Sequence, residues 1–417
     1  MTFEEVLHMA EAGNAEAQYV IGSAYLTGDG VDEDCEQAFY WISKAAEQGY
    51  RDAQSDLATM YYKGDGVQKD LAKSVEWYLK AAEQGDVNAQ FMVGSSYYDG
   101  EIAGVPQDNE LARKWLTEAA AQGDADAQFF LGNLYAYKMQ PTDTKEAVKW
   151  LKLSADQGNA DAQNLYGLFL KDGEGVAMNR PLAIQYIEQA AKQGHAEAQY
   201  NLGCALQNGT GCVANINQAL YWFTQAAQQG NPDAEYNLGV FYMNGIEVDQ
   251  DIFRAISLFK SASNKGNSSA SYNLGIIYGQ PVGVPLDLYE SKKWFQIAAQ
   301  QGDEDAEEKI QEVEQLINNN SSSTASGGRG GCYIATAVYG SYDCPPVWTL
   351  RRYRDNVLDA TWYGKLFIKV YYLISPVLVK FFGKQNWFVS FWRKKLDSFV
   401  LKLQASGFES SSYNDKH

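Results

Sequence analysis

Histidine is rare in this chain of 417 residues, and its cysteines are not paired by spacing. Three histidines and five cysteines are scattered along it, and no CxxC or Cys/His group with zinc-ligand spacing occurs. We therefore expect no metal site, no cofactor and reduced thiols. The amino terminus has no basic start followed by an apolar run, so no signal peptide is visible. These absences favour a cytoplasmic protein.

Sequence motifs of catalysis are missing as well. The chain has no GxSxG, Walker loop, HExxH or dinucleotide-binding fingerprint. Ser257 and Lys260 form one SxxK pattern, which is expected by chance at this serine and lysine content and has no accompanying KTG. We predict that the protein is not an enzyme and assign no catalytic residue.

Positive charge is in deficit, and it is unevenly distributed. Lys and Arg total 34 against 52 Asp and Glu, a net charge of -18, which argues against nucleic acid as a partner. Residues 332–417 alone hold 12 Lys and Arg against 6 Asp and Glu. An acidic region is thus joined to a basic carboxy-terminal segment, which could fold back on it or lie on an anionic surface.

What the sequence does contain is a repeat of about 36 residues. A phrase close to DAQYNLGxxYxxGxGVxxDxxxAxxWxxKAAEQG returns eight times between Asn14 and Gly302. A period of this length predicts a solenoid, in which each unit buries its apolar face against its neighbours. Such a chain offers a long binding surface instead of one enzymatic pocket.

Each repeat predicts two amphipathic helices. In the first repeat one runs from about Ala15 to Leu26, with Gln18, Ile21, Gly22 and Tyr25 on one face. Glycine occupies the Gly22 position in seven repeats, with Ala58 in the eighth. Because a mid-helix glycine costs about 1 kcal/mol relative to alanine, its recurrence predicts a close helix crossing.

The start of the second helix carries a cap in every repeat. An Asp or Asn stands seven residues before the Trp position, and such a residue caps the free amides of the first helical turn. The large Trp-position residues are expected to pack between helices. The caps are Asp34, Asp70, Asp108, Asp143, Asn179, Asn215, Asp251 and Asp287, and the large residues are Trp41, Trp77, Trp115, Trp150, Tyr186, Trp222, Leu258 and Trp294.

Over about residues 1–317 these features resemble the Sel1-like repeat family, a relative of the tetratricopeptide repeats. The resemblance implies an all-α fold, a right-handed α/α superhelical solenoid whose first helices line a concave groove. It also implies an adaptor that binds proteins. Some cysteine-rich members bind penicillin-like ligands or act as weak β-lactamases, but they carry paired cysteines in every repeat and this chain does not. Glu307 to Asn318 is predicted to be a polar helix that caps the solenoid.

The groove positions follow from the helical rotation. The residue before the Leu-Gly pair is apolar in the middle repeats, at Met92, Phe130 and Leu165. In the last three repeats it is an asparagine, at Asn201, Asn237 and Asn273, and these are preceded by Tyr200, Tyr236 and Tyr272. An asparagine ladder can pair with the main chain of an extended peptide. Alternatively, the asparagines hydrogen-bond between adjacent helices.

Acidic residues near the starts of the first helices are open to two interpretations. They either interact with helix dipoles or line the rim of a ligand site. They are Glu16, Asp52, Asp126, Asp161, Glu197 and Asp233.

The carboxy-terminal part divides into three segments. Residues 318–331 are rich in Asn, Ser and Gly and predict a flexible linker. Residues 332–405, with CYIATAVYGS, LRRYRDNVL and YYLISP, resemble the CFI-box domain of bacterial and archaeal proteins. Residues 406–417 predict a disordered tail. Helices are expected from Pro346 to about Leu358, from Trp362 to an interruption at Pro376, and from about Asn386 to Ala405.

The aromatic and basic residues near Trp392 have two interpretations. In the first, they form the core of a small helical module or belong to a module that docks on the array. In the second, they lie on a membrane surface. Cys332 is either a buried thiol or a modification site. We predict a non-enzymatic scaffold of the bacterial cytoplasm that binds a peptide or protein partner in its groove. The alternatives are a membrane-tethered scaffold, a β-lactam-binding protein, or a purely structural array.

Overall fold

The computed structural model describes residues 2–100, 105–280, 284, 286–323, 350 and 386–405. All the regular elements in these ranges are helices, which confirms the all-α prediction. The chain forms two compact units, residues 1–226 and 227–417, and each is described by itself. The helices expected from Pro346 and from Trp362, together with Cys332 and Cys344, lie outside the described residues.

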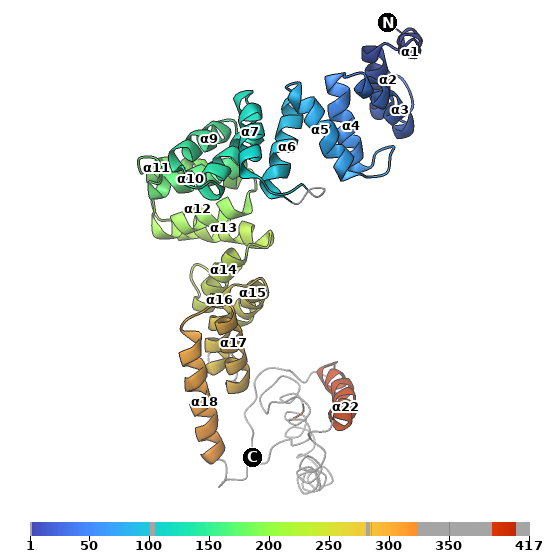
Figure 1. Ribbon diagram of the computed structural model, residues 1–417. Coiled ribbons are helices and arrows are strands. Elements are labelled where there is room, and N and C mark those ends of the chain that lie inside the picture. The colour runs from blue at the N-terminus through green and yellow to red at the C-terminus, as the bar shows by residue number, and fades with distance from the viewer. Residues whose placement is uncertain are drawn as a thin grey trace. The chain divides into compact units, whose positions relative to one another are not determined.

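Unit 1 consists of α1 (Phe3–Glu11) followed by six helix pairs, in which consecutive helices lie side by side (Figure 1). The first helices of the pairs are α2 (Ala15–Thr27), α4 (Arg51–Lys63), α6 (Val87–Asp99), α8 (Ala125–Asn133), α10 (Ala160–Asp172) and α12 (Ala196–Asn208). The second helices are α3 (Cys35–Glu47), α5 (Leu71–Glu83), α7 (Asn109–Ala121), α9 (Thr144–Asp156), α11 (Arg180–Lys192) and α13 (Ile216–Gln228). α8 continues as the π-helix η1 (Leu134–Lys138).

Unit 2 contains two further pairs, α14 (Pro232–Asn244) with α15 (Ile252–Asn264), and α16 (Ser268–Gly279) with α17 (Leu288–Gln300). The predicted capping helix is α18 (Ala306–Ser323), which extends into the segment expected to be a linker. Adding a residue to an existing helix forms one hydrogen bond without a new nucleation cost, so Asn and Ser residues can prolong it. α22 (Asn386–Ala405) has the bounds predicted from the sequence.

The predicted caps are present at the starts of the second helices. The Asp34 carboxylate accepts hydrogen bonds from the backbone amides of Glu36 and Gln37, both at 3.0 Å. The same role falls to the seven corresponding residues: Asp70, Asp108, Asp143, Asn179, Asn215, Asp251 and Asp287.

The recurring mid-helix glycine marks a close helix crossing, as predicted. A Cβ atom on Gly22 would lie 2.6 Å from Ile42 Cγ1, which is closer than two carbons can approach. The facing residue is the one after the Trp position, so Trp41 itself is not the side chain in the crossing. Equivalent pairs are Gly94 with Leu116, Gly132 with Leu151, Gly167 with Ile187, Gly203 with Phe223, Gly239 with Phe259, and Gly275 with Phe295.

A loop glycine joins one repeat to the one before it. Gly66 has a φ of 65°, and a Cβ there would lie 1.9 Å from the backbone oxygen of Cys35 in the preceding repeat. Gly175 and Gly211 meet the backbone oxygens of Thr144 and Arg180 in the same way. In the seventh repeat the corresponding residue is Glu247, with a φ of 55°.

Buried glutamines form a second connection between repeats, which the sequence analysis did not foresee. Gln54 is 5% exposed, and its Nε2 donates to the backbone oxygen of Ala46 at 3.2 Å. Its Oε1 accepts from Nε2 of Gln84 at 2.8 Å, and Gln84 also donates to the backbone oxygen of Gly49. Gln54 and Gln84 belong to the same repeat, so the connection to the preceding repeat is made through the backbone oxygens of Ala46 and Gly49. Further glutamine pairs within one repeat are Gln18 with Gln48, Gln90 with Gln122, Gln128 with Gln157, and Gln163 with Gln193.

Unit 2 replaces this pair with other chemistry. Glu235 and Lys265 stand where the two glutamines would be, and Lys265 Nζ lies 2.8 Å from Glu235 Oε1 and 3.0 Å from the backbone oxygen of Gly230. In the next repeat, Ser271 donates to Gln301 Oε1 at 2.5 Å. Lys265 and Gln301 still donate to a backbone oxygen of the preceding repeat, that of Gly230 and Ser263 respectively, so this contact between repeats is kept while the paired side chains change.

Candidate functional site

The predicted binding face consists of the residues that precede the Leu-Gly pair in each first helix. The neighbouring face is buried in the repeat core, which leaves these residues beside it and partly exposed. Met92, Phe130 and Leu165 are half-buried and pack against the apolar clusters of their repeats. The Phe130 ring makes edge contacts with Phe91 at 5.5 Å and Tyr98 at 5.2 Å. This part of the face is thus an apolar, preorganised surface.

The three asparagines of the predicted ladder differ in their bonding. Nδ2 of Asn201 donates to Oδ1 of Asn164 in the previous repeat at 3.0 Å, the inter-helix bond that was the alternative interpretation. Asn237 and Asn273 are half-buried and, within the described residues, their side chains have no hydrogen-bond partner. Their role in binding remains a prediction.

The three tyrosines beside them pack within their own helix pairs. Tyr200 lies 6.0 Å from Phe223 between ring centroids, Tyr236 lies 5.9 Å from Phe259, and Tyr272 lies 5.2 Å from Phe295. These phenylalanines are the residues that face the crossing glycines. Each tyrosine therefore supports the helix crossing with one side of its ring and stays half-exposed.

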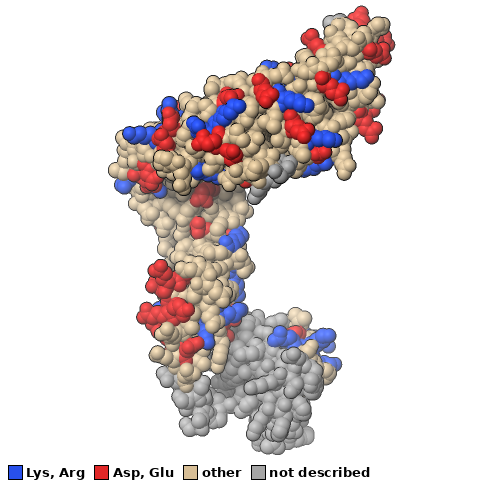
Figure 2. Space-filling model, in the orientation of Figure 1, with Lys and Arg blue, Asp and Glu red and all other residues tan. Residues whose placement is uncertain are grey.

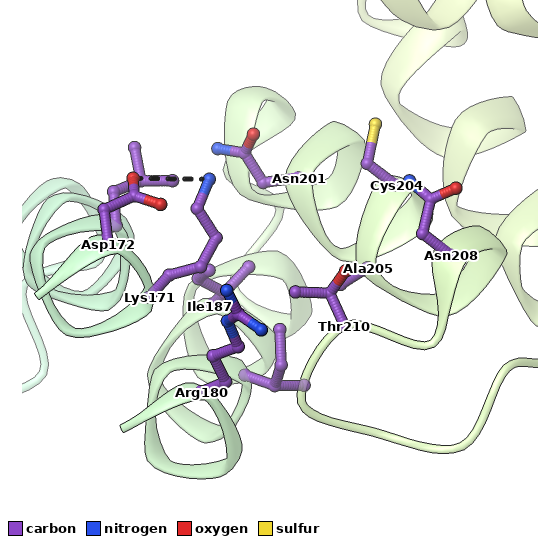
Figure 3. A pocket seen from close by; sticks show the side chains of 11 residues that line it. Lys171, Asp172, Arg180, Ile187, Asn201, Cys204, Ala205, Asn208 and Thr210 are labelled. Atoms are coloured by element: carbon purple, nitrogen blue, oxygen red, sulfur yellow. Dashed lines mark ion pairs between the residues drawn. The ribbon is translucent and has the colours of Figure 1, made fainter. Parts of the chain in front are cut away.

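A cavity of about 270 Å³ opens beside Asn201 (Figure 3). It is formed by α10, α11 and α12 of the fifth and sixth repeats, with Thr210 from the following loop. Ile184 and Ile187 provide apolar lining, and both are buried. Asn201, Cys204 and Asn208 line it from α12, with further lining from Leu168, Lys171, Asp172, Arg180 and Ala205.

The charges of this cavity are mainly positive. Lys171 Nζ is 3.6 Å from Asp172 Oδ2, with side-chain exposures of 34% and 53%. Arg180 begins α11, is exposed, and forms no ion pair within the described residues. Lys171 and Arg180 were not predicted from the sequence. The continuation of the Asn201 face to Cys204 and Asn208 corresponds in α10 to Leu168 and Asp172, so it points to the cavity but not to these two cations.

The amino-terminal end of the face is acidic. Burial raises the pKa of Asp56, a hydrogen bond with the Tyr19 hydroxyl lowers it, and the charges of Asp52 and Asp86 raise it further. Burial and the Asp56 carboxylate likewise raise the pKa of Tyr19. Asp56 thus places a carboxylate on the face at α4, whereas Lys171 and Arg180 bring cations to the cavity at α10 and α11.

Some of the acidic residues at helix starts have a structural partner in the next repeat. The Asp126 carboxylate accepts from Asn159 Nδ2 at 2.8 Å, and Asp233 accepts from Asn267 Nδ2 at 2.7 Å. Asp161 Oδ1 lies 3.0 Å from His195 Nε2. Neighbouring helix starts are thus linked through these side chains.

Ser257 and Lys260, which form the SxxK pattern, both lie on α15. Ser257 is exposed, and Lys260 Nζ lies 5.7 Å from the centre of the Tyr278 ring. Burial raises the pKa of the Cys212 thiol. Among the described residues, no group of three or more His, Cys, Asp and Glu could hold a metal ion. In the same part of the chain, no helix is long and apolar enough to cross a membrane.

On the face shown in Figure 2, Lys and Arg alternate with Asp and Glu over unit 1. The stacked helix pairs, the capped second helices and the glycine crossings recur along the chain and define its class: a helical-repeat protein. The Sel1 repeat family matches eight consecutive segments, residues 15–50, 51–86, 87–124, 125–159, 160–195, 196–231, 232–267 and 268–303. The chain belongs to the Sel1 repeat family.

Solved structures agree with this assignment. A Sel1 repeat protein from Oxalobacter formigenes is 31% identical, with a TM-score of 0.57, over 75% of this chain and 89% of that one. The protein c5321, a protective antigen of uropathogenic Escherichia coli with an SLR fold, is 24% identical, with a TM-score of 0.64, over 97% of this chain and 92% of that one. No curated protein matches the chain.

Proposed function

We propose that the protein is a scaffold that binds extended segments of protein partners along the exposed faces of the first helices within each unit. Sel1 repeat proteins are generally protein-interaction scaffolds. The observation that carries the proposal is the pair Asn237 and Asn273, half-buried amides at the same position of successive repeats without a hydrogen-bond partner among the described residues. A carboxamide offers both a donor and an acceptor, so it can pair with a peptide main chain.

The test is affinity capture of partners by the full chain, quantified by mass spectrometry. Asn237→Ala with Asn273→Ala should reduce capture of a specific partner by about tenfold, because two amide contacts of about 0.5–1.5 kcal/mol each are lost. Asn244→Ala with Asn264→Ala is the matched control, since both residues are exposed at helix ends. Equal capture by all three proteins would identify a purely structural array.

Asn201→Ala separates the two interpretations of that residue. It removes the bond to Asn164, so it should lower thermal stability as well as binding. The double variant in unit 2 should lower binding alone.

We also propose that the array acts by binding and not by catalysis. Ser257 and Lys260 offer no base held against a nucleophile, because Lys260 lies near aromatic rings. The β-lactam alternative is tested with a chromogenic cephem. Turnover that survives purification and is lost in Ser257→Ala would contradict this part of the proposal.

The proposed domain organisation is a solenoid over residues 1–317, a linker at 318–331, a CFI-box-like module at 332–405 and a short tail. The proposed compartment is the bacterial cytoplasm. Because α18 runs to Ser323, limited proteolysis should cut first after that residue. First cuts within the repeats would contradict this division.

A membrane-surface tether is a second candidate function, and α22 favours it. This helix exposes Phe391 at 53% and Leu401 at 67%, and it carries Arg393, Lys394 and Lys395. Basic helices with exposed apolar residues bind anionic bilayers. Flotation with phosphatidylserine vesicles should recover the full chain, and Phe391→Ser with Leu401→Ser should abolish recovery. Absence of the wild-type chain from the vesicle fraction would contradict a membrane-tether function.

A further inference from the structure

We propose that the cavity beside Asn201 receives a single Asp or Glu side chain of the partner segment. This inference rests on the proposed function and names the chemistry by which one part of the face recognises its partner. It follows from the placement of Lys171 and Arg180 in a cavity of a chain that is otherwise strongly acidic.

Two cations line the cavity against one anion. Lys171 comes from the last turn of α10 and Arg180 from the first residue of α11, so both belong to the fifth repeat. Asp172 balances one of them at 3.6 Å, a loose ion pair with both side chains partly exposed. One positive charge is left over, and the guanidinium of Arg180 has a fork geometry that fits a carboxylate.

The walls strengthen this attraction. Ile184 and Ile187 are 7% and 1% exposed, and with Leu168 they give the cavity an apolar side. Charges next to apolar walls interact more strongly than charges surrounded by water. Asn201 and Thr210 add polar groups to the lining, where a neighbouring peptide group of the ligand could be held.

The size of the cavity points to a side chain. A volume of about 270 Å³ is below the 300–1,000 Å³ that is usual for cofactors and drug-sized ligands. It is sufficient for one carboxylate side chain and part of the adjoining main chain.

The surrounding charge disfavours a polyanion. Asp161 and Glu197 lie near the first turns of α10 and α12, the helices whose later turns line the cavity. A chain of phosphates or a run of acidic residues would be repelled there. A single carboxylate flanked by neutral or basic residues fits the cations of the cavity and avoids the acidic residues at the helix starts.

The experiment is selection of end-capped random heptapeptides on the full chain. We expect enriched peptides to carry Glu or Asp at one fixed position and no second acidic residue beside it. Replacing that residue with Gln should weaken binding about tenfold, the loss of one charge-assisted contact. Enrichment without a fixed acid, or with acidic runs, would overturn the proposal.

Variants of the cavity complete the test. Lys171→Met with Arg180→Met should remove the preference for the acid, and Arg180→Lys should retain much of it. The matched control is Lys149→Met with Lys192→Met, because these exposed lysines pair with Glu146 and Glu188 away from the cavity. An acid preference that is equal in the cavity variant and the control would refute the assignment. Melting curves exclude loss of folding.

The two levels of the proposal fail differently. If selected peptides lack an acid but depend on Asn237 and Asn273, the carboxylate assignment is wrong and the scaffold function stands. If no partner or peptide depends on those asparagines or on the cavity residues Lys171 and Arg180, the scaffold function fails.

Discussion

Lys265 pairs with Glu235 of the same repeat, with 2.8 Å between Nζ and Oε1, and the two replace the glutamine pair found at Gln54 and Gln84. Glu235 is 6% exposed, and its other oxygen, Oε2, has no hydrogen-bond partner among the described residues. This buried carboxylate therefore has one charged partner, Lys265, and one neutral donor, the Ser261 hydroxyl, which lies 2.9 Å from Oε1. Removing one partner from such a pair is costly, whereas exchanging both for a neutral pair can preserve stability.

This relationship predicts a non-additive pair of substitutions. Lys265→Gln should lower the free energy of unfolding by about 1–3 kcal/mol, because it leaves the Glu235 carboxylate without a counter-charge. Lys265→Gln with Glu235→Gln should recover most of that loss by forming the pair present in unit 1. Urea denaturation of the wild-type chain, of Lys265→Gln, of Glu235→Gln and of the double variant measures the coupling energy between the two side chains. Additive losses would show that the two side chains do not act together.

The glycine crossings predict an inversion of helix propensity. Gly203→Ala should destabilise the protein by about 1–3 kcal/mol, although alanine is the better helix former. The reason is that the new Cβ would lie 2.7 Å from Cε1 of Phe223. Ala58→Gly, at the same position of the second repeat, should also destabilise, by about 1 kcal/mol, since alanine is accommodated there. Thermal melts compare the two, and a stabilising Gly203→Ala would disprove the close crossing.

Glu247 predicts a stabilising substitution. It is the only non-glycine residue with positive φ in the described ranges, at 55°, and glycine adopts this conformation without steric cost. Glu247→Gly should raise the free energy of unfolding by about 0.5–1 kcal/mol. Glu247→Ala is the control, because it removes the carboxylate but keeps the Cβ atom. If alanine stabilises as much as glycine, charge and not backbone strain is the cause.

Asp56 predicts a pH-dependent effect. Its pKa is raised in the folded protein, chiefly by burial, so the ionised form is disfavoured there relative to the unfolded chain. Asp56→Asn should therefore raise the melting temperature at pH 7 while keeping an acceptor for the Tyr19 hydroxyl. The advantage should shrink as pH falls through the Asp56 pKa, because the native carboxyl is then neutral. A difference that does not vary between pH 7 and pH 4 would contradict this account.

The helix pairs could be predicted from the sequence because each signal occurs once per repeat. Asp34 and its counterparts mark the second helices, and Gly22 and its counterparts mark the crossings. The residue that faces the glycine, Ile42 in the first repeat, was not predicted, because the recurrence of glycine in one helix does not indicate which face of the partner helix meets it. The glutamine contacts could have been found from the joint recurrence of Gln54 and Gln84 counterparts.

The candidate site was only partly predictable for a different reason. Periodicity places Asn201 on an exposed face, but a cavity arises where side chains of three helices leave space unfilled. Lys171 and Arg180 occupy the last turn of one helix and the first residue of another, so no single helical pattern relates them. The bond from Asn201 to Asn164 likewise depends on the distance between neighbouring repeats, which spacing along the chain does not give.

The buried glutamine of each first helix in unit 1 donates to a backbone oxygen of the helix immediately before it, as Gln54 does to Ala46. Every junction of this kind in unit 1 uses the same donor and the backbone oxygen of an alanine, whatever lies further along the chain. Duplication or loss of one 36-residue segment would therefore recreate an identical seam at the new join. Array length can change during evolution in this region without redesign of any neighbouring segment.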